Sequence, residues 1–180
     1  MKDILEIILE KIKKTPSDYQ AYEDLFLMCE DTLETDKPKA VQYLRVLSAT
    51  IEENMKSCSD DLMVKLYNLH KRVLLVAAPH DFDSYLLYIE WNREPDKKFY
   101  VPRRKILKQV VDALQQLADG DLDLLAISLP PGSGKTTLAI FFLTWLAGRV
   151  PDEPMLTGSH SNSFVRGVYD ECLRILDPQG

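Results

Sequence analysis

The chain has 180 residues, and its hydrophobic fraction of 46% and charged fraction of 28% are typical of globular proteins. Its formal net charge of −6 at pH 7 gives no overall attraction for nucleic acid, so such contacts would need a local basic patch. The three cysteines, Cys29, Cys58 and Cys172, fit no metal-binding spacing, and their odd number argues against a disulfide framework. We therefore predict reduced and mostly buried thiols.

The sequence also argues against membrane insertion and secretion. The longest apolar run, residues 138–148, is shorter than the roughly 18 residues that a membrane-spanning helix needs. The N-terminus has acidic residues within its apolar stripe and lacks a small-residue cleavage site, so it does not resemble a signal peptide. These features predict a cytoplasmic protein without a membrane partner.

Residues 1–92 are predicted to form an all-helical region, because apolar side chains recur there at spacings of three and four residues. The linkers between the helices are short, which favours antiparallel neighbours, and no fixed repeat period is present. The expected helices are residues 3–14, one from Ser17 or Asp18, one from near Pro38, one from Ser59 to before Pro79, and a short one within 81–92.

Residues 93–102 are charged, bracketed by prolines and without periodicity, so they are predicted to be a linker. Residues 103–180 then predict a helix that ends at Gly120, a strand at 124–129, a loop, a helix at 135–148, a strand at 154–159 and a helix at 162–176. This order of strand, loop, helix, strand and helix favours an α/β fold with a parallel sheet, as in P-loop NTPases. Two strands are too few for a stable parallel sheet, so we expect the natural protein to continue past Gly180 or this chain to be a fragment.

The stretch SLPPGSGKTT, residues 128–137, contains the groups that bind the phosphates of a nucleoside triphosphate. Gly132 and Gly134 allow positive φ and leave room for phosphate oxygens, and Lys135 can reach the β- and γ-phosphates. The Thr136 hydroxyl is placed to hold Mg²⁺. The predicted cofactors are ATP and Mg²⁺, with Lys135 and Thr136 as the catalytic candidates. The predicted nucleotide-binding residues are Pro131, Gly132, Ser133, Gly134, Lys135, Thr136 and Thr137.

This stretch departs from the full P-loop pattern at one position, because Leu129 stands where that pattern has its first glycine. Pro130 and Pro131 offer another route for the turn, since each proline fixes φ near about −65°. The alternative interpretation is a glycine turn that begins an ordinary helix.

Three features together resemble the start of the ATPase domain of tailed-phage terminase large subunits. They are the LPPGSGKTT loop, the LTWLAGRVPDEPML exit from the following helix, and TGSHSNSFVRGVYDEC after the second expected strand. The resemblance covers roughly residues 99–176. It implies a viral DNA-packaging ATPase in the host cytoplasm, which pumps double-stranded DNA and carries a nuclease domain further along. The implied partners are a portal, a small terminase subunit or sister motor subunits.

Several residues outside the loop have both a functional and a structural interpretation. Arg103 and Arg104 begin a basic stretch, and the resemblance implies a nucleotide contact upstream of the loop; the alternative is a solvated surface. Arg166 could act as an arginine finger or lie on the surface, and His160 could sense the nucleotide or be structural. Trp145 is expected in the core.

Two other functions stay open. One is a different P-loop ATPase, of the helicase or AAA type. The other is a non-catalytic helical adaptor that carries an incomplete nucleotide-binding fold. No acidic strand end that could hold the metal for hydrolysis can be placed before Gly180. Complete ATP hydrolysis by these 180 residues is therefore not expected.

Overall fold

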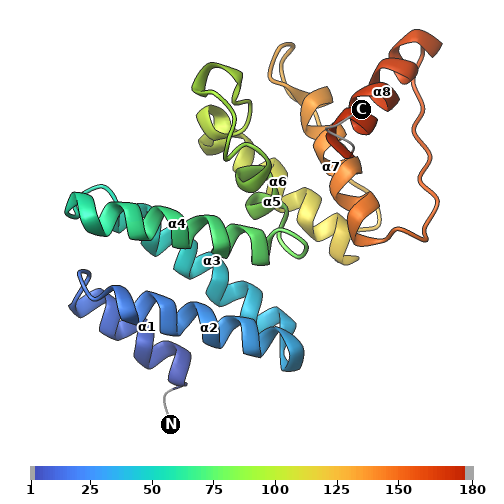
Figure 1. The fold of residues 1–180 in the computed structure, drawn as a ribbon. Coiled ribbons are helices and arrows are strands. Elements are labelled where there is room, and N and C mark those ends of the chain that lie inside the picture. The colour runs from blue at the N-terminus through green and yellow to red at the C-terminus, as the bar shows by residue number, and fades with distance from the viewer. Residues whose placement is uncertain (1–2, 177–180) are drawn as a thin grey trace. The chain divides into compact units, whose positions relative to one another are not determined.

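A computed structural model describes residues 3–176 of the chain, which divides into two compact units, Met1–Trp91 and Asn92–Gly180. Both are helical in the part of the chain that the structure describes (Figure 1). The first unit contains α1 (Ile4–Lys14), α2 (Tyr19–Thr35), α3 (Lys37–Asn54), α4 (Asp60–Ala77) and α5 (Phe82–Ile89). The second contains two single 3₁₀ turns, Pro95–Lys97 and Val101–Arg103, followed by α6 (Arg104–Asp119), α7 (Lys135–Arg149) and α8 (Asn162–Leu176).

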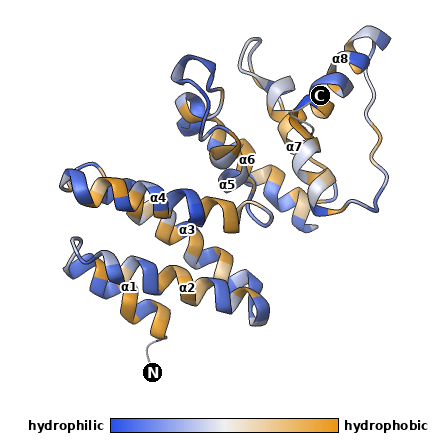
Figure 2. Ribbon diagram, viewed as in Figure 1, coloured by the Kyte–Doolittle hydropathy of each residue, from blue (hydrophilic) through white to orange (hydrophobic). Residues whose placement is uncertain are grey.

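The first unit is a stack of helices in which neighbours along the chain pack together. α2 contacts α1 and α3, α4 contacts α2 and α3, and α5 packs against α4. Hydrophobic and hydrophilic residues are mixed along each of these helices, as is typical of amphipathic helices (Figure 2). Full burial of one such apolar side chain stabilises the fold by about 1.5–3 kcal/mol. The central core side chains are Leu5, Ile12, Tyr22, Leu25, Phe26, Cys29, Leu44, Leu47, Ile51, Leu66, Leu69 and Val73.

Aspartate side chains cap three of these helices, Asp3 at α1, Asp36 at α3 and Asp81 at α5. The Asp36 carboxylate accepts a hydrogen bond from the backbone N–H of Lys39 at 3.2 Å, where α3 begins. At the start of α5, buried Asp81 accepts from the Ser84 N–H at 2.9 Å and from the Nε of Arg45 at 2.7 Å. The bonds from Lys39 and Ser84 satisfy backbone N–H donors in the first turns of α3 and α5, and Arg45 pairs with the buried Asp81 carboxylate.

The second unit is organised around α7, whose buried face provides most of its core. Leu138, Phe141 and Trp145 are almost fully buried, so the expectation that Trp145 belongs to the core is confirmed. α7 packs on α8, and Arg149 near its end pairs with Asp119 at the end of α6 at 2.6 Å. α6 ends at Gly120, as predicted, with that glycine in the left-handed conformation.

The predicted α/β fold is wrong, because the described residues 3–176 contain no strand and therefore no parallel sheet. The expected strands at 124–129 and 154–159 lack regular secondary structure and pair with no other segment in that range. Leu124 is 84% exposed and Leu156 is 99% exposed, so neither apolar run is buried as a strand would be. A strand depends on ladder hydrogen bonds to a neighbouring chain segment, and apolar composition alone does not supply one.

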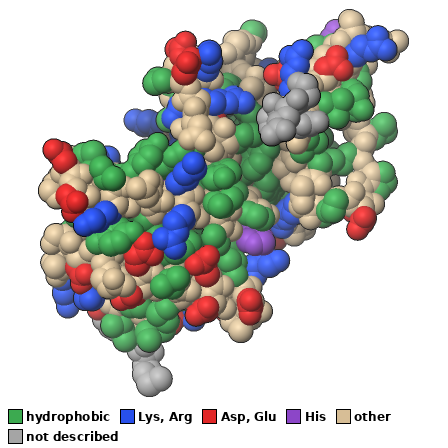
Figure 3. Space-filling model, viewed as in Figure 1, with side chains coloured by type: hydrophobic (Ala, Val, Ile, Leu, Met, Phe, Trp, Pro, Cys, Tyr) green, Lys and Arg blue, Asp and Glu red, His purple; other side chains and the backbone are tan. Residues whose placement is uncertain are grey.

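The predictions for the cysteines are confirmed only in part. Cys29 is buried, whereas Cys58 and Cys172 are only partly buried, and all three are free thiols. Within residues 3–176, no helix is long and apolar enough to cross a membrane. Over α1 to α4, basic and acidic side chains are interspersed on the face shown in Figure 3 rather than gathered by sign. The last four residues of the predicted 103–180 region lie outside the described part of the chain.

Candidate phosphate-binding site

The phosphate loop, residues 130–137, has the backbone conformation that its glycines predict. Gly132 has φ of +77° and Gly134 has φ of +89°, so both are left-handed. The Ser133 N–H donates to the Pro130 carbonyl at 3.3 Å, which closes a turn over residues 130–133 that includes both prolines. The prolines therefore make the turn that the missing glycine at Leu129 would otherwise support. Left-handed residues in succession to right-handed ones turn backbone N–H groups toward a common concavity, which is an anion-binding geometry.

α7 begins immediately after Gly134, and this N-cap residue has no side chain that could cap the first N–H groups of the helix. The first hydrogen bond within the helix runs from the Leu138 N–H to the Gly134 carbonyl at 2.9 Å. The N–H groups of Lys135, Thr136 and Thr137 precede that bond, so helix geometry leaves them available to water or to an anion. The helix dipole adds roughly half a positive charge at this end. The start of α7 is therefore suited to a phosphate group.

Lys135 contributes the positive side chain of the site. Its Nζ donates a hydrogen bond to the Leu129 carbonyl at 2.5 Å, so the side chain folds back over the loop. Lys135 and Thr136 are exposed, and Thr137 is half-buried. A phosphate oxygen could replace the carbonyl as the partner of Nζ, with a charge-assisted hydrogen bond in place of a neutral one.

Thr136 is the residue that could hold a magnesium ion brought in with ATP. Its hydroxyl is on the first turn of α7, next to Lys135, as the motif requires. The described residues contain no group of three or more His, Cys, Asp or Glu side chains arranged to hold a metal ion. Ser133 provides a further hydroxyl in the loop, and its buried oxygen has no hydrogen-bond partner within the described range.

Phe99 belongs to this site, although the sequence indicated only a linker at 93–102. A side-chain Cβ built on Gly134 would lie 2.1 Å from Cε2 of Phe99, so the ring edge is packed against the glycine backbone. The Phe99 ring also contacts the Phe141 ring of α7, with centroids 6.0 Å apart. No local sequence signal reveals this contact, because Phe99 precedes Gly134 by 35 residues and the pairing exists only in the folded unit.

The structure places the predicted arginines at different positions. The Arg103 guanidinium lies 5.4 Å from the centroid of the Phe99 ring, so Arg103 and the loop share one aromatic side chain. Arg104 is the first residue of α6. Arg166 lies on α8 and lines a hollow formed by residues 157–170, whose lining includes no residue of the phosphate loop. Arg103 thus contacts an aromatic residue that touches the loop, whereas Arg166 lines a different hollow.

The contacts of His160 are with residues outside the phosphate loop. His160 is exposed in the segment before α8, its ring stacks on Phe164 with centroids 6.3 Å apart, and its Nδ1 lies 3.3 Å from the Ser159 hydroxyl oxygen. These contacts agree with the structural interpretation of this residue.

These elements define what the site can do chemically. Two left-handed glycines, an uncapped helix start and one lysine can bind a compact anion with several oxygens. Hydrolysis would further require groups that hold a metal and position water. Comparisons of the chain with protein-family models, with curated proteins and with solved structures find no match.

Proposed function

We propose that this chain is a non-catalytic helical adaptor that binds the phosphates of a nucleotide at residues 130–137. The observation that carries the proposal is the conformation of the loop: Gly132 and Gly134 are both left-handed immediately before an uncapped helix. Lys135 lies at the first position of that helix and folds back over the loop. A glycine turn that merely begins a helix has no need of this combination.

The helical architecture supports binding without turnover. In P-loop ATPases, a neighbouring strand end positions the carboxylate that holds the metal and the group that orients water. The described residues form no such strand next to the loop. ATP with Mg²⁺ is the proposed ligand, with Thr136 as the residue that would contact the ion. A cytoplasmic location, where ATP is abundant, stays a prediction.

DNA packaging stays a prediction of the terminase resemblance. Double-stranded DNA, a portal, a small terminase subunit and sister motor subunits are its predicted partners. DNA packaging would require ATP turnover, which the phosphate-release measurement below tests.

The proposal is tested by calorimetric titration of the full chain with Mg-ATP and with pyrophosphate. Lys135→Ala should weaken both affinities by about a hundredfold, because it removes a charge-assisted hydrogen bond and a cation from the anion site. Lys56→Ala is the matched control, since it removes an exposed lysine charge from the first unit and should leave both affinities unchanged.

Two results would contradict the proposal in different ways. Equal affinity of the wild type and Lys135→Ala for pyrophosphate would remove the site. Release of phosphate from Mg-ATP by the wild type, but not by Lys135→Ala, would show ATP turnover. That result would favour an ATPase over a non-catalytic adaptor.

A further inference from the structure

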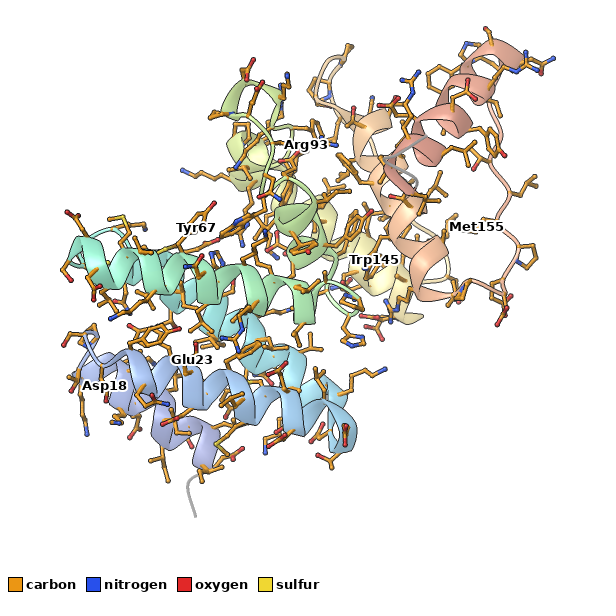
Figure 4. The ribbon with its side chains drawn as sticks, viewed as in Figure 1. Asp18, Glu23, Tyr67, Arg93, Trp145 and Met155 are labelled. Carbon is orange, nitrogen blue, oxygen red and sulfur yellow. The ribbon has the colours of Figure 1, made fainter. Side chains whose placement is uncertain are left out.

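The segment before α6, residues 93–103, contacts α7 and the glycine before it. The proposed phosphate binding does not itself require these contacts. Phe99 touches both Gly134 and the Phe141 ring. Arg93 lies over the same Phe141 ring, with its guanidinium 5.4 Å from the ring centroid. The Arg93 side chain can be followed in Figure 4. The segment is thus attached to α7 through aromatic rings at the point where the phosphate loop ends.

The Phe99 ring occupies the space next to Gly134 that a side chain would need. A Cβ at position 134 would be 2.1 Å from Cε2 and 2.7 Å from Cζ of Phe99, distances that no real side chain adopts. The left-handed φ of Gly134 favours glycine on its own. A Cβ at this position would in addition require the Phe99 ring to shift.

Phe99 is itself held by Arg103. The Nη1 of Arg103 donates to the Phe99 carbonyl at 3.0 Å, and its guanidinium lies over the face of the Phe99 ring. A cation over an aromatic face is attractive, so the exposed Arg103 side chain contacts both the backbone and the ring of Phe99. The ring edge is left to face Gly134.

We propose that Phe99 is a positioning residue that holds Gly134, and with it the start of α7, in the conformation that receives phosphate. This inference rests on the proposed phosphate binding for its functional meaning, and on the ring contact for its structural content. Phe99 does not touch the ligand in this account; it acts through the loop backbone.

The test compares Phe99→Leu with Phe142→Leu in the full chain. Leucine at position 99 keeps an apolar side chain next to Phe141 but lacks the Cε2 and Cζ edge that touches Gly134. Phe142 of α7 is a buried aromatic residue whose ring lies near that of Trp145, with centroids 6.0 Å apart. Its replacement by leucine removes the same ring atoms from a different aromatic residue of the second unit.

Amide hydrogen exchange gives a readout that does not depend on ligand. The Leu138 N–H donates to the Gly134 carbonyl and reports the start of α7, whereas the Val150 N–H donates to the Leu146 carbonyl and reports its end. Phe99→Leu should raise exchange at Leu138 relative to Val150 by about tenfold, because the helix start opens locally. Phe142→Leu should leave this ratio within about twofold, because its effect is not confined to one end. Equal ratios in the two variants would overturn the proposal.

A double-mutant comparison tests the contact itself. Gly134→Ala should speed Leu138 exchange strongly in the wild type, where the new methyl group meets the ring. In the Phe99→Leu background only the strain of the left-handed φ remains, so the same substitution should have a smaller effect. Equal effects of Gly134→Ala in the two backgrounds would show that Phe99 does not constrain Gly134.

Pyrophosphate titration separates this inference from the proposed function. The Kd for pyrophosphate should rise about tenfold in Phe99→Leu and stay unchanged in Phe142→Leu. A wild-type chain that binds no pyrophosphate would overturn the proposed function, while the exchange ratios would still decide whether Phe99 holds the loop. Binding that Phe99→Leu leaves intact, with unchanged exchange, would overturn the positioning role and leave the phosphate site standing.

Discussion

The thiol of Cys29, in the core of the first unit, has a strongly raised pKa. Burial raises the pKa of this thiol from 9.0 to about 12, and the nearby Glu30 carboxylate adds to the shift. The protonated thiol is therefore favoured in the folded state. Its stabilising contribution is fully present below the unfolded pKa near 9 and is lost as pH rises toward 12.

We predict that the stability advantage of the wild type over Cys29→Ala falls by about 2 kcal/mol between pH 9 and pH 11. The measurement is urea unfolding of the full chain at several pH values, followed by circular dichroism. Ile51→Val provides the control, because it removes a buried methylene group without a titratable atom, and its cost should not vary with pH. A difference between the wild type and Cys29→Ala that stays constant with pH would contradict the assigned burial effect.

The loop residues show what a local motif can predict. The left-handed conformations of Gly132 and Gly134 follow from the sequence alone, because a loop that wraps an anion needs positive φ where only glycine adopts it at little cost. The part played by Phe99 could not be predicted, since it depends on the tertiary contact of a residue in an irregular segment. Lys135 was predicted as a phosphate ligand, and its hydrogen bond to Leu129 gives the geometry that the ligand would replace.

At the scale of elements, two glycines near helix ends have opposite requirements. Gly120 ends α6 with φ of +82°, and nothing else lies within 4 Å of an added Cβ there. Gly148 lies within α7, has no left-handed φ, and likewise has open space around it. The two positions therefore differ in backbone conformation and not in packing.

Gly120→Ala should destabilise the chain by about 1 kcal/mol, because an alanine is strained at positive φ. Gly148→Ala should stabilise it by about 0.5–1 kcal/mol, because alanine loses less backbone entropy in a helix. Thermal unfolding of the full chain measures both changes. The same sign for the two substitutions would mean that φ does not control these positions.

The helices were predictable and the strands were not, for a physical reason. A helix closes its hydrogen bonds within itself, so spacings of three and four residues in the sequence record its buried face. A strand closes them with another segment, and the apolar residues of 124–129 and 154–159 do not say whether that segment is present. Leu124 and Leu156 remain exposed, although their neighbours gave the expected apolar pattern.

The whole molecule joins a helical unit with a conventional core to a unit that presents the phosphate loop. In the first unit, the core residues come from α1 to α4 and follow the amphipathic patterns of the sequence. In the second, α7 has a dual role, because its buried face supplies the core and its first turn supplies the candidate anion site. In this unit the candidate site thus lies at the start of a helix, and the described residues form no sheet beside it.

The most direct measurement of the central claim is a two-dimensional amide NMR titration of the full chain with pyrophosphate. The account predicts saturable shifts concentrated at the backbone amides of Gly132, Gly134, Lys135, Thr136 and Thr137, and their loss in Lys135→Ala. Amide shifts confined to the first unit, or no shifts at these five positions at saturating pyrophosphate, would contradict the proposed phosphate site.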